Sequence, residues 1–178
     1  MKRIKRLFCM VFVVTMFLCS CVNVSAAGDK SVSTDKKTGW ITKGKNTYYR
    51  TSKGKLVKNQ TKTIGKNTYL FDKKGRVVKG VKKNGVYYDY YSKADGRYLY
   101  SYIDLKIKTM EDASLIGKKG SGEYRVFDNV RFLNRKGKSI SFHKLRKGQK
   151  IRVYFQGNEG ILETFPAQFA KVIKVKAF

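Results

Sequence analysis

The chain has little of what catalytic and cross-linked proteins usually carry. Its three cysteines (Cys9, Cys19, Cys21) all lie in the first 21 residues, so a chain shortened past that point has neither a disulfide nor a thiol nucleophile. A single histidine, His143, excludes a metal site built on several histidines. No G-x-S-x-G nucleophile elbow occurs. We therefore expect no enzyme, no cofactor and no metal. The remaining enzymatic alternative is a carbohydrate-active accessory protein.

The sequence also lacks an apolar run of the ~20 residues that a membrane-spanning helix needs. The segment Leu7 to Val22 is almost wholly apolar but has only 16 residues. It follows the basic stretch Met1 to Arg6 and precedes the small-residue pattern Val24-Ser25-Ala26. This order is typical of an export signal. We predict that residues 1–27 are a signal peptide, that no transmembrane span remains after processing, and that the protein is secreted.

A second outcome of export concerns Leu18-Cys19-Ser20-Cys21, which resembles a bacterial lipobox. Lipid anchoring through Cys21 is therefore the alternative to simple cleavage near Ala26. Residues 28–38 are polar and have no periodicity, which predicts a flexible linker.

Acidic residues are scarce, since 12 Asp and Glu stand against 40 Lys and Arg and the formal net charge is +28. Loss of the four basic residues before Ala26 reduces this charge to +24. For an exported protein the matching polyanions are teichoic acids, anionic lipid head groups, acidic glycans and extracellular DNA. The alternative is that the lysines are solvated turn residues that keep edge strands from pairing with other chains.

What the chain does have is an internal repeat. Gly44 to Lys58 (GKNTYYRTSKGKLVK) returns 21 residues later as Gly65 to Lys79 (GKNTYLFDKKGRVVK), with nine of the 15 positions identical. A looser third copy keeps the phase at Tyr90 and Gly96. A fixed period of this length indicates stacked units that cannot each bury an apolar face alone.

Each unit has the pattern of a β-hairpin. An aromatic and β-branched run such as Thr47 to Tyr49 is followed by the polar turn Thr51 to Gly54 and a second short apolar run, Leu56 and Val57. Residues 39–98 are therefore predicted to form a short β-hairpin solenoid of about three 21-residue repeats, with the aromatic rings stacking between units.

These stretches, GWITKGKNTYYRTSKGKLVK, TIGKNTYLFDKKGRVVKG and VKKNGVYYDYYSKADGRY, resemble the cell-wall-binding repeats of Gram-positive surface proteins. That superfamily includes choline-binding, glucan-binding and clostridial toxin repeats. Choline-type cages in it use Trp, and this chain has only Trp40. The resemblance thus implies a cell-surface location on a Gram-positive-type bacterium and at most one divergent site, near Trp40, Tyr48 and Tyr69.

Residues 99–178 lack the 21-residue period but contain six alternating or apolar runs. These are Tyr100 to Lys108, Glu123 to Leu133, Ser139 to Phe142, Lys150 to Phe155, Gly160 to Phe165 and Phe169 to Val175. Short antiparallel strands in ~80 residues predict a small closed or nearly closed β-barrel. The whole protein is thus predicted to be all-β.

The ending GKSISFHKLRKGQKIRVYFQGNEGILETFPAQFAKVIKV is similar to a small domain of unknown function found in exported Bacillus-type proteins, many of them lipoproteins. The resemblance implies an oligonucleotide/oligosaccharide-binding (OB) type barrel and carries no assigned activity.

The leading hypothesis is a secreted, surface-associated protein whose repeats bind cell-wall polysaccharide or teichoic acid. Aromatic faces would stack on sugars or cationic groups, and lysines would contact phosphates. The candidate ligand-binding residues are Trp40, Tyr48, Tyr49, Tyr69, Phe71, Lys45 and Lys66. The structural alternative is that at least half of these rings stack inside the solenoid and stabilise it.

The second hypothesis is a polyanion or extracellular nucleic-acid binder that uses the basic C-terminal barrel. Stacking rings and cations would form one face, from Tyr124, Phe127, Phe132, Tyr154, Arg125, Arg131 and Arg152. The sequence sets no oligomeric state.

Overall fold

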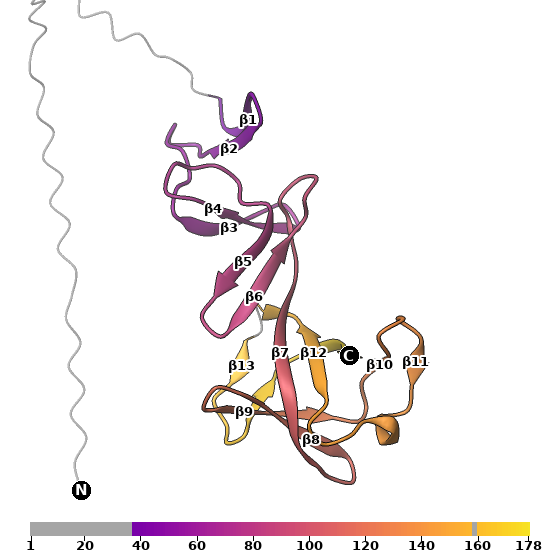
Figure 1. Ribbon diagram of the computed structural model, residues 1–178. Coiled ribbons are helices and arrows are strands. Elements are labelled where there is room, and N and C mark those ends of the chain that lie inside the picture. The colour runs from indigo at the N-terminus through magenta and orange to yellow at the C-terminus, as the bar shows by residue number, and fades with distance from the viewer. Residues whose placement is uncertain (1–36, 158–159) are drawn as a thin grey trace, which may run out of the picture. The chain divides into compact units, whose positions relative to one another are not determined.

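The computed structural model describes residues 37–157 and 160–178 (Figure 1). The predicted signal peptide, the three cysteines and the linker up to residue 36 lie outside the described residues. The described part of the chain contains strands, turns and short 3₁₀ segments such as Phe142–Lys144, and no α-helix. The all-β prediction is therefore confirmed.

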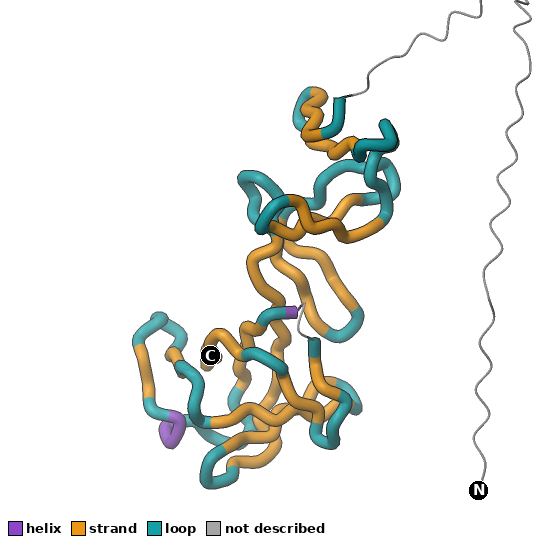
Figure 2. The backbone as a smooth tube through the Cα atoms, turned by 180° about the vertical axis from the view of Figure 1, so that it is seen from behind, coloured by secondary structure: helices purple, strands orange, loops and turns teal. Residues whose placement is uncertain are grey.

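Three two-stranded hairpins occupy the region of the predicted repeats (Figure 1). They are β1 (Gly39–Lys43) with β2 (Asn46–Arg50), β3 (Gln60–Ile64) with β4 (Asn67–Phe71), and β5 (Gly80–Asn84) with β6 (Tyr87–Tyr91). Figure 2 shows the loops that connect successive hairpins, between β2 and β3 and between β4 and β5.

Each hairpin ladder forms across an earlier turn than the one predicted. The sequence analysis paired the strands on either side of the turn Thr51 to Gly54, but β1 and β2 pair before it. The first ladder forms across the two-residue turn Gly44–Lys45, whereas Leu56 makes only an isolated bridge with Arg50. Gly44 has a φ of 56° and Lys45 is not among the described residues with positive φ, as in a type II′ turn. The Gly54 turn also reverses the chain, since the Gly54 N–H donates to the Thr51 carbonyl, but the chain beyond it is too short to extend the ladder.

Consecutive units touch through the glycine of this second turn. A Cβ added at Gly75 would lie 3.0 Å from the carbonyl oxygen of Val57 and 3.1 Å from Cγ of Lys58. At Gly96 the added Cβ would lie 2.2 Å from Cγ1 of Val77. Both positions therefore require glycine for two reasons: φ is positive (81° and 79°), and there is no room for a side chain.

The third hairpin is out of phase with the other two by one residue. β4 follows β2 by 21 residues, but β6 follows β4 by 20. Asp89, and not Tyr90, therefore occupies the buried position that Tyr69 holds in β4. The predicted phase of Tyr90 was wrong, because a one-residue shift moves every side chain of a strand to the opposite face.

The remaining strands form one large sheet, which β5 and β6 join through β7. They are β7 (Tyr98–Met110), β8 (Ser114–Lys119), β9 (Gly122–Phe127), β10 (Phe132–Leu133), β11 (Ser139–Ile140), β12 (Lys150–Phe155), β13 (Ile161–Leu162), β14 (Ala167–Phe169) and β15 (Val172–Ala177). The main path is β11-β10-β15-β12-β7-β8-β9-β14-β13, and its end strands do not pair. Pairs β10–β15 and β9–β14 are parallel. These strands thus form an open mixed sheet, whereas the sequence predicted a small antiparallel barrel, closed or nearly closed; the described strands do not form a closed barrel.

The core of this sheet follows from the alternation along β7. Ser101, Ile103, Leu105 and Ile107 are buried, and the residues between them face outward. The inward apolar side chains pack with those of β12, among them the fully buried Phe155. An alternating strand with one apolar face is stabilised in this way because burial removes that face from water.

The observed strands correct two further details of the sequence analysis. The predicted run Glu123 to Leu133 is divided into β9 and β10. Strand β8 (residues 114–119) was not predicted. Its last three residues, Gly-Lys-Lys, were interpreted as part of a loop, and the segment before them as a possible short helical turn. Its first four residues are all buried, so tertiary packing decides its structure.

Candidate functional site

The repeat region contains a compact aromatic group, which we call the Trp40 cluster: Trp40, Tyr49, Tyr69 and Phe71. The Trp40 ring centroid lies 5.1 Å from that of Tyr49 and 4.8 Å from that of Tyr69, both in edge-to-face geometry. The Phe71 ring is nearly parallel to the indole, at 24° and 6.3 Å. The register explains the meeting, because Trp40 pairs with Tyr49 across the first ladder.

The rings of this cluster differ in their access to solvent. Tyr69 is 8% exposed and Phe71 is 1% exposed, and both belong to a small core with Val57. Tyr49 is half-buried. Trp40 is 44% exposed. The cluster therefore presents one solvent-exposed ring, Trp40, which packs on buried rings. It does not form an aromatic cage.

The other predicted site residues lie outside this cluster. Tyr48 points to the opposite face of β2, where its Cδ1 would be 3.7 Å from a Cβ at Gly75. Lys45 and Lys66 are exposed at the tips of the first two hairpins, in the turns that follow β1 and β3. The structure thus brings four of the seven residues together. Lys45 lies in the turn at one end of the first hairpin, and the Gly39–Arg50 pair lies at the other end. Lys66 lies in the corresponding turn of the second hairpin.

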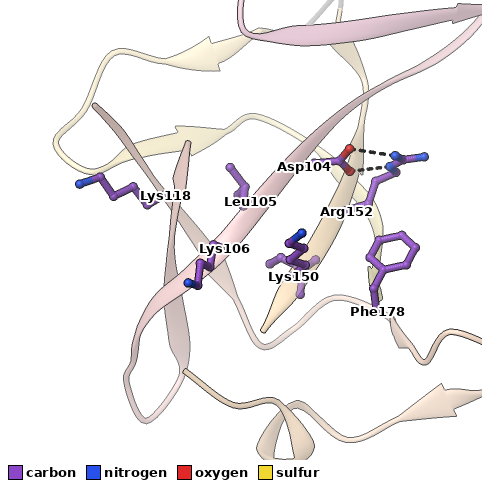
Figure 3. A pocket seen from close by; sticks show the side chains of 8 residues that line it. Asp104, Leu105, Lys106, Lys118, Lys150, Arg152 and Phe178 are labelled. Carbon is purple, nitrogen blue, oxygen red and sulfur yellow. Dashed lines mark hydrogen bonds and ion pairs between the residues drawn. The ribbon is translucent and has the colours of Figure 1, made fainter. Parts of the chain in front are cut away.

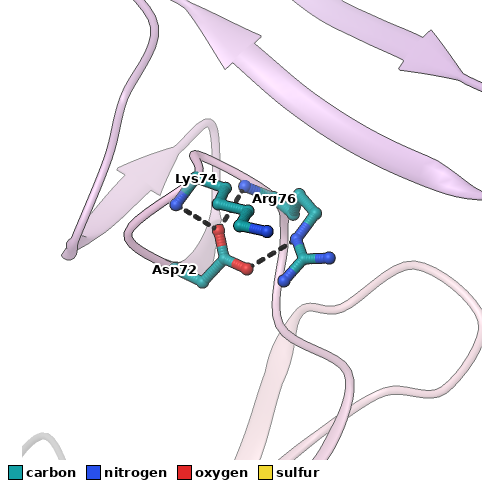
Figure 4. A network of polar contacts seen from close by, with 3 residues as sticks. All are labelled: Asp72, Lys74 and Arg76. Carbon is teal, nitrogen blue, oxygen red and sulfur yellow. Dashed lines mark hydrogen bonds and ion pairs between the residues drawn. The ribbon is translucent and has the colours of Figure 1, made fainter.

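A carboxylate fixes the turn that positions β4 against the next unit. Asp72 accepts hydrogen bonds from the backbone N–H groups of Lys74 (2.9 Å) and Arg76 (2.8 Å) and from Nε of Arg76 (2.7 Å), as Figure 4 shows. Desolvation alone would raise the pKa of Asp72, but the hydrogen bonds and charge of Arg76 outweigh it and lower the pKa below 3.8. The turn is therefore held most firmly with Asp72 ionised.

The sequence analysis did not single out Arg50. Its Nε is buried and has no hydrogen-bond partner among the described residues. Arg50 ends β2 and faces Gly39 at the start of β1, one position along from the Trp40–Tyr49 pair. A buried unpaired donor is costly unless something accepts its hydrogen bond. No signal in the sequence distinguishes this arginine from the other basic residues.

The residues of the nucleic-acid hypothesis do not form one face. Tyr124 and Phe132 are buried in the core of the large sheet, whereas Phe127 is exposed. Arg125 forms an ion pair with Glu111, and Arg152 forms one with Asp104. The proposed stacking and phosphate surface of these seven residues is therefore corrected, since the alternation of β9 separates Tyr124 from Phe127.

Within residues 37–157 and 160–178, no group of three His, Cys, Asp or Glu side chains is placed to hold a metal ion. No described helix has the length and apolar character needed to cross a membrane.

No protein-family model and no curated protein matches the sequence. Solved structures with some similarity include CbpJ from Streptococcus pneumoniae TIGR4, at 17% identity and a TM-score of 0.35, over 60% of this chain and 33% of that one. Choline binding protein F from Streptococcus pneumoniae has 18% identity and a TM-score of 0.37, over 59% and 34%. A multimodular pneumococcal cell wall endolysin from phage Cp-1, complexed with choline, has 20% identity and a TM-score of 0.35, over 62% and 34%. The chain spans about a third of the length of each of these proteins.

Proposed function

We propose that the protein is a secreted, surface-associated binding protein whose repeats dock on a cell-wall polymer through Trp40. The observation that carries the proposal is a single open indole, 44% exposed, held by edge-to-face contacts on Tyr49 and Tyr69. A rigid, half-exposed aromatic ring binds flat apolar surfaces at little entropic cost. The repeat resemblance and the predicted export signal give the same expectation.

The geometry favours a sugar ring over a quaternary ammonium group as the ligand of Trp40. An aromatic cage needs several open faces around one cation. Here Tyr69 and Phe71 are buried, so only one open face remains. The strong positive charge of the chain also repels a cationic ligand and attracts an anionic glycan.

The test is a pull-down of the full chain on purified Gram-positive cell walls, with and without teichoic acid. The key variant is Trp40→Ala, and Phe127→Ala is the matched control because Phe127 is 43% exposed and lies in β9, outside the cluster. Binding is measured at ~1 M salt, where the Debye length is ~3 Å and long-range attraction is screened.

We expect Trp40→Ala to weaken wall binding roughly fivefold, because an aromatic contact is worth about 1 kcal/mol. Phe127→Ala should bind like the unchanged protein, and circular dichroism should show that both variants are folded. If Trp40→Ala binds as well as its control, Trp40 is not the docking residue. If all binding disappears at high salt, the protein acts on walls only as a polycation.

A further inference from the structure

The outward face of β7 changes in character along the strand. Its outward residues are Tyr100, Tyr102, Asp104, Lys106 and Lys108. Strands β6 and β8 pair with one edge of β7, at Tyr98–Tyr102 and Lys106–Met110, and β12 pairs with the other. Residues directly opposite each other share a face, so each outward residue of β7 begins a row that crosses several strands.

One such row consists of lysines alone. Lys106 pairs directly with Lys118 of β8 and with Lys150 of β12. We call Lys118, Lys106 and Lys150 the lysine row. Neighbouring strands lie ~4.8 Å apart, so the backbone positions of the three lysines lie within ~10 Å. Like charges directly opposite each other in a sheet are unfavourable.

The nearby carboxylates do not neutralise this row. Asp104 is held by Arg152, with Nε at 2.6 Å from Oδ1 and NH2 at 2.8 Å from Oδ2. Glu123, which pairs with Lys118 across β8 and β9, forms its ion pair with Lys108. None of the three lysines in the row has a side-chain ion pair or hydrogen bond in the described part of the chain. The row therefore has uncompensated charge and free donors.

The lysine row lines a pocket of about 470 Å³ (Figure 3). In Figure 3, Lys106 and Lys150 lie side by side on neighbouring strands, and the Asp104–Arg152 pair closes one side. Phe178 adds an apolar wall, with the guanidinium of Arg152 5.8 Å from its ring centroid. The pocket is large enough for a phosphate group with its attached polyol or sugar.

Next to this pocket, the same face carries tyrosines. Tyr88 stacks on Tyr102 at 5.3 Å and 19°, and Tyr90 stacks on Tyr100 at 5.0 Å and 17°. Tyr154 of β12 continues the row of Tyr102. We call these five residues the tyrosine rows. They follow directly from the one-residue shift of the third hairpin, which turns Tyr88 and Tyr90 outward.

Most ring faces of the tyrosine rows are occupied. Apart from the two stacks, Arg152 lies over Tyr102 at 4.3 Å, Lys174 over Tyr154 at 4.9 Å, and Lys119 over Tyr88 at 5.2 Å. What the rows mainly offer a ligand is their hydroxyl groups.

The hydroxyls of the two stacked pairs are available as hydrogen-bonding groups. Those of Tyr88, Tyr90, Tyr100 and Tyr102 have no hydrogen-bond partner among the described residues. Burial raises the pKa of Tyr100 and of Tyr102 above 10.0, so both phenols are protonated donors at neutral pH.

We propose that this face is a second binding site, in which the lysine row binds the phosphates and the tyrosine rows bind the hydroxyls of a polyol-phosphate or sugar-phosphate polymer. Charge complementarity selects a polyanion, because three lysines without an acidic partner line one pocket. The phenol hydroxyls, which donate and accept, match a backbone rich in hydroxyl groups.

The same observations disfavour single-stranded nucleic acid as the ligand. Proteins that bind it use aromatic rings with open faces on which bases stack. In the tyrosine rows, stacking partners and cations already cover most of those faces. A base would have to displace them, whereas a polyol needs only the outward hydroxyls.

The experiment measures binding of the full chain to fluorescent oligo(glycerol phosphate) by anisotropy, with oligo(dT) of equal phosphate number as comparison. The test variant carries Lys106→Gln, Lys118→Gln and Lys150→Gln. Its control carries Lys136→Gln, Lys138→Gln and Lys144→Gln, which remove the same charge at exposed positions outside the described pocket. A third variant, Tyr90→Phe with Tyr100→Phe, removes two hydroxyls and keeps the ring stack.

We expect the lysine-row variant to bind oligo(glycerol phosphate) roughly tenfold more weakly than the control, as three exposed ion pairs together would give. The slope of log affinity against log salt should fall by about 2, since each released single-strand contact contributes ~0.7. The tyrosine variant should lose roughly threefold for the polyol phosphate and nothing for oligo(dT), because one or two hydroxyl hydrogen bonds are removed.

Three results would overturn the proposal. The first is equal affinity of the lysine-row variant and its control. The second is tighter binding of oligo(dT) than of oligo(glycerol phosphate). The third is an unchanged affinity of the tyrosine variant for the polyol phosphate. The outcome is separate from the Trp40 hypothesis, because Trp40→Ala should leave binding of the free oligomer unchanged at this second site.

Discussion

Gly75 offers a direct test of whether consecutive repeat units pack through their turns, because the chain contains a matched control glycine. Gly75 and Gly137 have the same φ of 81°. Both end the same kind of turn, in which the glycine N–H donates to the carbonyl three residues earlier, Asp72 or Asn134, at 2.9 Å. They differ in surroundings, since a Cβ at Gly137 would meet nothing within 4 Å.

The expected magnitudes follow from this difference. An alanine in the left-handed region costs about 1–2 kcal/mol, so Gly137→Ala should lower the free energy of unfolding by that amount. At Gly75 the added methyl also presses on the Val57 carbonyl at 3.0 Å, whose residue is held by a hydrogen bond from its N–H to Tyr49. Overpacking of this kind costs a further 1–3 kcal/mol or so. Gly75→Ala should therefore lose about 2–5 kcal/mol.

Urea unfolding measures both losses in the full chain. Trp40 is the sole tryptophan, so its fluorescence reports on the repeat region, while near-ultraviolet circular dichroism of the tyrosines reports mainly on the large sheet, which holds nine of the 12 tyrosines. An equal loss in the two variants would show that the turn glycine does not contact the preceding unit. The reasoning about repeat packing would then be refuted, whatever the absolute values.

Two further predictions concern charge and core packing. Because the pKa of Asp72 is lowered in the folded protein, its ionised form stabilises the fold above pH 3.8, and this contribution is lost as the pH falls further. The unfolding temperature of Asp72→Asn should therefore lie below that of the unchanged protein near neutral pH and approach it in acid. A difference in unfolding temperature that does not change with pH would contradict the assignment. Phe155, fully buried between Tyr87 at 5.4 Å and Phe169 at 4.9 Å, should cost about 3–5 kcal/mol on replacement by alanine, measured by urea unfolding. A loss below about 1 kcal/mol would show that the site collapses or is loosely packed.

The sequence predicted the strand content well where a local pattern decides it. The alternation in residues 100–108 marks the buried and outward faces of β7, and Lys150–Phe155 was predicted with the observed bounds. It failed where the phase of a repeat changes. Tyr90 keeps the 21-residue spacing of Tyr48 and Tyr69, yet the connection before the third hairpin (residues 72–79) is one residue shorter than the one before the second (residues 51–59), and the turn that ends at Gly96 is one residue longer. Because these two length changes cancel, they leave the 21-residue spacing intact and cannot be detected from it.

The candidate sites show the same division. Four of the aromatic residues singled out in the repeats form the Trp40 cluster, but burial separates Trp40 from Tyr69 and Phe71, and only packing shows this. The lysine row could not be predicted at all. Its members lie in three strands, and one of them, β8, was not recognised from the sequence. Their meeting depends on strand register, which is set by distant pairing and not by local composition.

The length of β7 bears on how this protein could have been assembled from parts. The predicted boundary between residues 98 and 99 falls at the first residues of β7, which pairs with β6 of the last hairpin and with β8 and β12 of the large sheet. A cut at this boundary would leave β6 with an unpaired edge prone to aggregation. The last hairpin can therefore be exchanged by recombination only together with β7, and added repeats would have to be inserted upstream, before Gly80.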